Sequence, residues 1–91
     1  MGPNKMNPQK IDEIDALILE EKRTIAREHF LNAWDAAISE GIEPQIIARA
    51  LVHGALSELA SLKGDKEAAK MISDIRAMEA SGEFLLDKTL Q

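Results

Sequence analysis

Residues 44–62 read PQIIARALVHGALSELASL, and this stretch decides which fold the chain can adopt. Only Arg49 and Glu58 carry a full charge in these nineteen residues. At about 100° per residue, the apolar side chains surround a helix almost completely instead of forming one stripe. Such a helix must be covered on every side, so we expect it to be the buried centre of a helical assembly.

The rest of the chain contains few residues that could bury the central helix. The 91 residues make one domain at most. A folded monomer of this size buries roughly 60–65% of the surface of its unfolded chain, which makes a marginal core. The chain has no Cys, so neither a disulfide nor a thiolate metal site can reinforce it. We therefore expect a second copy of the chain to supply the missing cover in a homodimer.

A long helix is expected before the central segment. Residues 1–7 form a lead that contains Gly, Pro and Asn and is expected to be disordered. Asn7-Pro8 is a favourable helix start, with Asn as N-cap and Pro at the first helical position. Neither Gly nor Pro interrupts the chain from there to about Glu40, and Gly41 suits the left-handed residue after a helix.

The apolar face of this first helix changes direction along its length. The isoleucines at positions 11, 14, 18 and 25 lie on one side, whereas Phe30 and Trp34 lie more than about 100° away. A straight helix drifts by only about 20° per heptad relative to a heptad repeat. Two explanations are open: a kink around residues 21–24, or a helix whose two ends contact different neighbours.

A third helix follows the central one. Gly64 should end the central helix after Lys63, and Asp65 is the expected N-cap of the next helix. That helix should bury one apolar face and stop at Ser81-Gly82. The apolar face comprises Ala68, Met71, Ile72, Ile75 and Met78. An apolar tail, Phe84, Leu85 and Leu86, is expected to pack back onto the helices.

These elements predict an all-α fold. The expected architecture is a three-helix antiparallel bundle over residues 8–91, with a long first helix, a buried central helix, an amphipathic third helix and a short C-terminal tail. The bundle should form a single helical domain that dimerises.

Small residues mark the most favourable place for an interface. They recur at three- and four-residue spacing on one side of the central helix: Ala50, Gly54, Ser57 and Ser61. Small side chains let helix backbones approach closely. Gly54 costs about 1 kcal/mol relative to Ala within a helix, so a close neighbour must offset that cost. Phe30 and Trp34, one turn apart, are the bulky candidates for the core or the same interface.

Catalytic and metal-binding patterns are missing from the sequence. The chain has neither Cys nor Tyr, no serine in a Gly-x-Ser-x-Gly turn and no glycine-rich phosphate loop. Neither His29 nor His53 belongs to the His-Glu-x-x-His motif of zinc proteases. Neither one belongs to the Glu-x-x-His motif of di-iron helical bundles. We therefore expect no enzyme, no metal and no cofactor.

Charge and hydropathy narrow the range of partners. The net charge of −5 repels phosphate backbones and anionic lipid, and Pro44-Gln45-Ile46-Ile47 is a poor start for a DNA-recognition helix. The central segment is too short and too interrupted by charge for a membrane span, and no apolar signal region follows the N-terminus. We expect a cytoplasmic protein that binds neither nucleic acid nor membrane.

The sequence thus favours a non-enzymatic homodimer that acts as a small interaction or regulatory module, with another protein as a further candidate partner. The alternative is a carrier or sensor of small molecules. Its apolar pocket would be lined by Phe30, Trp34, Met71 and Met78, with Arg49 or His53 as the polar anchor.

Overall fold

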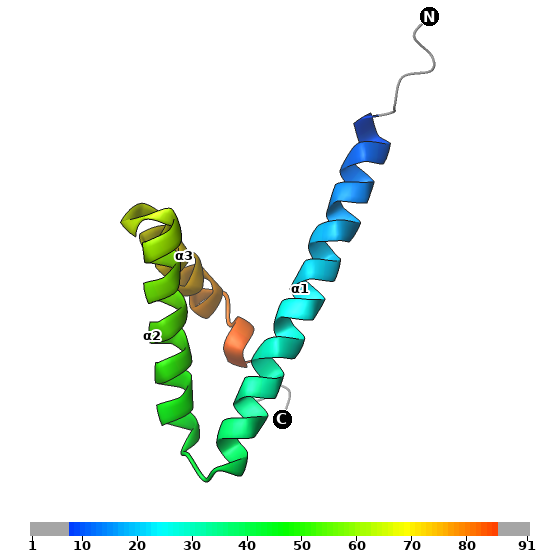
Figure 1. Ribbon diagram of the computed structural model, residues 1–91. Helices are drawn as coiled ribbons and strands as arrows, with labels where there is room; N and C mark the ends of the chain where they lie inside the picture. Colours follow the sequence, from blue (N-terminus) through cyan, green and yellow to red (C-terminus); the bar gives the residue numbers. More distant parts are fainter. Residues whose placement is uncertain (1–7, 86–91) are drawn as a thin grey trace, which may run out of the picture. The chain divides into compact units, whose positions relative to one another are not determined.

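The computed structural model describes residues 8–85, and this part of the chain is all-α, as predicted (Figure 1). Its elements are α1 (Pro8–Ser39), α2 (Pro44–Lys63), α3 (Asp65–Ala80) and a single 3-10 turn, η1 (Glu83–Leu85), with no strand between residues 8 and 85. The predicted bounds of all three helices are confirmed to within one or two residues. The lead at residues 1–7, its Asn7 cap and Leu86 lie outside the described residues.

The chain divides into two compact units, the first ending at Glu43 and the second beginning at Pro44. The first unit contains α1, and the second contains α2, α3 and η1. The single domain expected over residues 8–91 remains a prediction.

Helix α1 ends in a hydrogen-bonded glycine motif. The N–H of Gly41 donates to the carbonyl of Ile38 at 2.9 Å, and the N–H of Ile42 donates to that of Ala37 at 3.3 Å. These are the two bonds of a Schellman cap, which needs a left-handed residue after the helix. Gly41 has φ +82°, so its predicted role as the helix stop is confirmed.

Helix α1 is continuous through the segment where its apolar face changes direction. Figure 1 draws it as one ribbon with no sharp bend between residues 21 and 24. There the Thr24 hydroxyl donates to the carbonyl of Glu20, one turn earlier in the same helix, at 3.1 Å. A kink therefore does not explain the change of face, and different neighbours at the two ends stay a prediction.

The corner between α2 and α3 is one residue long, and here the sequence prediction was wrong. Gly64, not Asp65, is the N-cap of α3, and no side chain caps the helix. The N–H of Gly64 donates to Ala60 at 2.8 Å, while its carbonyl accepts from Ala68 at 3.4 Å. With φ +99° and ψ 161°, Gly64 adopts a backbone conformation that only glycine reaches readily. The helix resumes at once, so Asp65 falls in its first turn.

Helices α2 and α3 pack against each other within the second unit. Of the predicted α3 face, Ala68, Ile75 and Met78 are half-buried, whereas Met71 and Ile72 are exposed. Among residues 11–85, Ile47 is the only buried one, and 4% of its surface remains exposed. Within its own unit, α2 is therefore not buried on every side as the sequence predicted. The physical reason is that two packed helices meet along one face of each.

The end of the described chain also departs from expectation. Ser81 caps α3 and Gly82 follows with φ +81°, so the predicted stop is confirmed. Phe84 and Leu85 form part of η1 but remain 61% and 51% exposed, so the helices of their own unit do not bury them as predicted. The N–H of Leu85 donates to the carbonyl of Gly82 at 3.0 Å, which closes a local turn that leaves both side chains outside.

Candidate functional site

The four small residues of α2 form an exposed strip. Ala50, Gly54, Ser57 and Ser61, called the small-residue strip below, are all exposed. Their spacing places them within about 60° of one another around the helix axis. Helix α3 does not bury the strip. Within the second unit, this side of α2 is therefore accessible to a partner.

The second unit contains no neighbour close enough to Gly54 to require a glycine at this position. A Cβ built on Gly54 meets no heavy atom within 4 Å. The backbone at Gly54 is ordinary α-helix, which alanine would adopt with a lower loss of conformational entropy. Packing of α3 on α2 therefore does not offset the cost of this glycine, and the close neighbour expected at this position stays a prediction.

Phe30 and Trp34 form an aromatic pair along α1. Their ring centroids are 5.9 Å apart and their planes are inclined at 43°. Phe30 is 45% exposed, whereas Trp34 is half-buried. The pair lies in the first unit and the small-residue strip in the second, so the structure describes them as two separate groups.

An open, shallow hollow runs along α2 next to the small-residue strip. Both candidate polar anchors, Arg49 and His53, line it one helical turn apart. The other lining residues are Gln45, Ile46, Ala48, Ala50, Val52 and Leu56. Met71 and Met78 of α3, which the carrier hypothesis placed around the ligand, are not part of this lining.

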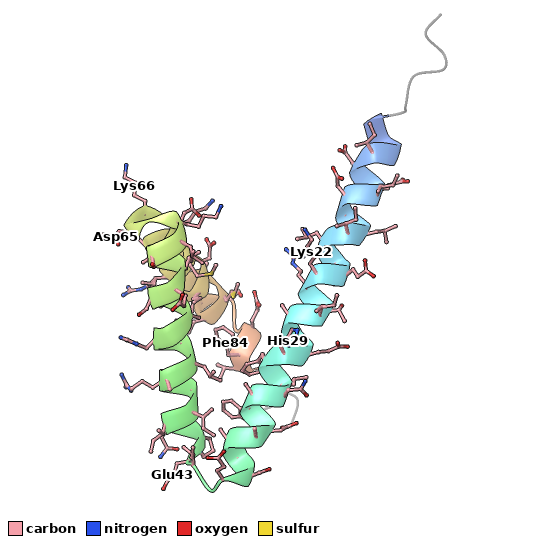
Figure 2. The ribbon with its side chains drawn as sticks, viewed as in Figure 1. Lys22, His29, Glu43, Asp65, Lys66 and Phe84 are labelled. Atoms are coloured by element: carbon pink, nitrogen blue, oxygen red, sulfur yellow. The ribbon has the colours of Figure 1, made fainter. Side chains whose placement is uncertain are left out.

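The titratable side chains in the described residues are solvent-exposed and dispersed. His29, labelled in Figure 2 on α1, and His53 on α2 are both exposed. One ion pair is formed in the described part, between Arg23 and Glu20 at 3.6 Å, and both side chains remain solvent-exposed. No group of three His, Asp or Glu residues in residues 8–85 is arranged to hold a metal ion. The arrangement offers surfaces for contact and shows no assembled reactive centre among the described residues.

The sequence reasoning did not single out the isoleucine stripe of α1 as a site. We use this name for Ile11, Ile14, Ile18 and Ile25, all of which are exposed in the structure. A second shallow hollow on α1 includes Ile14 and Ile18. The signal that could have identified the stripe is the seven-residue spacing of three of its isoleucines, which is typical of coiled coils.

Comparison with known proteins assigns no family: no family model, no curated protein and no solved structure matches the chain. None of the helices in the described part of the chain has both the length and the apolar character required to cross a bilayer.

Proposed function

We propose that this chain is a cytoplasmic, non-enzymatic homodimer that serves as a small interaction or regulatory module. Each chain would contribute three helices packed as an antiparallel bundle, and the small-residue strip of α2 would lie in the interface with the second copy. Phe30 and Trp34 would supply its bulky contacts.

The observation that carries this proposal is the exposure of apolar surface on each of the two units, taken by itself, within residues 11–85. Ile47 alone is buried among residues 11–85, while Ile46, Val52 and Leu62 of α2 are all more than half exposed. Large exposed apolar surfaces are typical of interaction sites. A 32-residue helix such as α1 also needs packing of its apolar face, because helix propensity alone gives marginal stability.

Gly54 supports the placement of the interface on α2. Its missing side chain leaves room that nothing in its own unit uses, and a helix from a second copy could approach there. A two-fold axis along such a contact would bring the same strip of both chains together.

The absolute mass in dilute solution tests the proposal. Light scattering behind a sizing column should give about twice the 10.0 kDa of the chain for the wild type. Gly54→Leu should restore the monomer mass, because its side chain would occupy the space of the approaching helix. Ala48→Leu is the matched control, since it adds the same side chain to another exposed side of α2 and should leave the dimer intact. A wild-type monomer at micromolar concentration would overturn the proposal.

The hollow beside Arg49 and His53 favours a second candidate function. A carrier or sensor of small anionic molecules would use the Arg49 guanidinium to hold the charge and the neighbouring apolar side chains to hold the body of the ligand. Titration with short-chain carboxylates, followed through the NMR signals of His53, tests this function. Shifts that saturate in the wild type and vanish in Arg49→Gln would support it, and unchanged signals would exclude it.

A further inference from the structure

The isoleucine stripe of α1 has the spacing of a short coiled-coil seam. Ile11, Ile18 and Ile25 are seven residues apart, which places them at successive a positions of a heptad, and Ile14 then takes a d position. Their side chains are 39–50% exposed although they are apolar and on one face. Glu21 and Glu28 occupy the following d positions, so the apolar seam ends at Ile25.

Two opposite charges flank this seam on the same side. Asp15 and Lys22 both fall at the e position that borders the isoleucines. Along α1 neither of them forms an ion pair, because no residue of opposite charge lies three or four positions from either one. Figure 2 labels Lys22 on α1, where its side chain projects from the helix. The flank therefore carries one free carboxylate and one free ammonium group, separated by seven residues.

This charge pattern distinguishes the possible orientations of a second helix. In an antiparallel pair, the e residues of one helix lie beside the e residues of the other. With a two-fold axis at Ile18, Ile11 lies level with Ile25 of the second copy, and Asp15 lies within about one residue of the level of Lys22. Equivalent positions then meet across the axis, instead of the alternating a and d positions of a standard antiparallel coiled coil. Symmetry repeats both contacts. A parallel pair would instead bring Lys22 beside Leu17 of the second copy, at a g position.

We propose that the isoleucine stripe of α1 is a self-docking surface that pairs antiparallel with the same stripe of a second copy, centred on Ile18. The inference rests on the homodimer proposed above and assigns it a seam and an orientation. It also accounts for the two apolar faces of α1: the N-terminal stripe pairs with the same stripe of the second copy, and the Phe30–Trp34 end contributes to the interface around the small-residue strip.

Single cysteines test the register directly, because the chain has no Cys of its own. Under mild oxidation, Ile18→Cys should form a disulfide-linked dimer. Ile11→Cys alone should not, since the two copies of residue 11 would be about 21 Å apart along the axis, beyond the roughly 7 Å limit of a disulfide. A mixture of Ile11→Cys and Ile25→Cys chains should form the mixed disulfide, identified by peptide mapping.

Each other outcome contradicts a distinct part of the inference. Disulfides of Ile11→Cys and of Ile25→Cys with themselves would show a parallel seam and overturn the orientation. A mass near twice 10.0 kDa under reducing conditions, with no disulfide at any of the three positions, would overturn the seam while leaving the homodimer. Cover of the stripe by the chain's own second unit would give that result. A reduced wild type at the monomer mass would overturn the homodimer itself.

Charge exchange gives an independent test. Asp15→Lys should raise the dissociation constant at low salt by about fivefold or more, because it sets like charges beside each other twice. Adding Lys22→Asp should restore the wild-type value. Asp12→Lys is the matched control, since it makes the same charge change on another side of α1. An equal effect of both lysine substitutions, with no recovery in the double variant, would overturn the Asp15–Lys22 contact.

Discussion

The rings of Phe30 and Trp34 lie 5.9 Å apart between centroids, one helical turn from each other, with their planes inclined at 43°. Within an isolated helix, a pair at this spacing contributes only about 0.2–0.5 kcal/mol. Phe30 is nevertheless 45% exposed, so a contact beyond the pair could still bury nearly half of its surface.

Phe30→Ala should therefore weaken association more than it weakens the helix. We expect the dissociation constant of the dimer to rise by at least about fivefold, as for a residue that anchors an interface. Helix content at low concentration, followed by circular dichroism, should change little. Leu31→Ala is the control, because Leu31 is similarly exposed but lies on another side of α1. Equal losses in both variants would remove Phe30 from the interface.

Gly54→Ala should stabilise the monomer and destabilise the dimer. The new methyl group has open space in its own unit and reduces the cost of glycine in a helix by about 0.5–1 kcal/mol. In urea denaturation of dilute protein, the midpoint should rise. Light scattering at higher concentration should show weaker association, because the methyl group keeps a neighbouring helix at a distance. Stronger association in this variant would contradict the placement of Gly54 in the interface.

Gly41→Ala should have the opposite effect on the monomer. A Cβ at Gly41 also meets open space, but its φ of +82° is strained for alanine. We expect the free energy of unfolding to fall by about 1–2 kcal/mol. Gly41→Ala and Gly54→Ala add the same methyl group at two glycines with open space around them. Opposite changes in the free energy of unfolding would therefore be caused by the difference in backbone conformation. A rise in the urea midpoint for Gly41→Ala would show that the Schellman cap does not form.

Glu21→Leu should strengthen the dimer if the isoleucine stripe pairs as proposed. Glu21 lies at the d position between Ile18 and Ile25, so leucine would extend the apolar seam on both copies. We expect the dissociation constant to fall by about tenfold or more, since burying one leucine contributes roughly 1.5–3 kcal/mol. Glu13→Leu, an equal change on another side of α1, should not have this effect. Similar gains from both would indicate non-specific hydrophobic association.

Most helix ends could be predicted because their causes are local. Gly41 and Gly82 end helices by adopting left-handed backbone conformations, and Pro44 starts α2 because its ring already fits the first helical turn. The corner at Gly64 could not be predicted from local preference. Asp65 is a better N-cap by residue type, but the backbone leaves no residue between the glycine and the helix.

The spacing of the residues in each candidate surface could be predicted from the sequence, but their burial or exposure could be predicted less well. The spacing of Ala50, Gly54, Ser57 and Ser61 placed them on one side of a helix, and the structure shows that side exposed. The hydrophobicity of the tail suggested burial, yet Phe84 is exposed because a local turn at Gly82 directs the chain. The hydrophobicity of a side chain favours its burial, but it does not determine which neighbouring residues bury that side chain.

From the sequence alone it followed that residues 8–85 are helical, where most of the helix ends lie, and which helix carries apolar residues on nearly every side. These properties depend on intrinsic propensity, on glycine and proline, and on periodicity within a few turns. The tertiary structure decided that α3 covers one face of α2, that Ile47 becomes buried, and that Gly54 has no close neighbour in its own unit. Those outcomes depend on how helices meet, because a single packing partner can cover only one side of a cylinder.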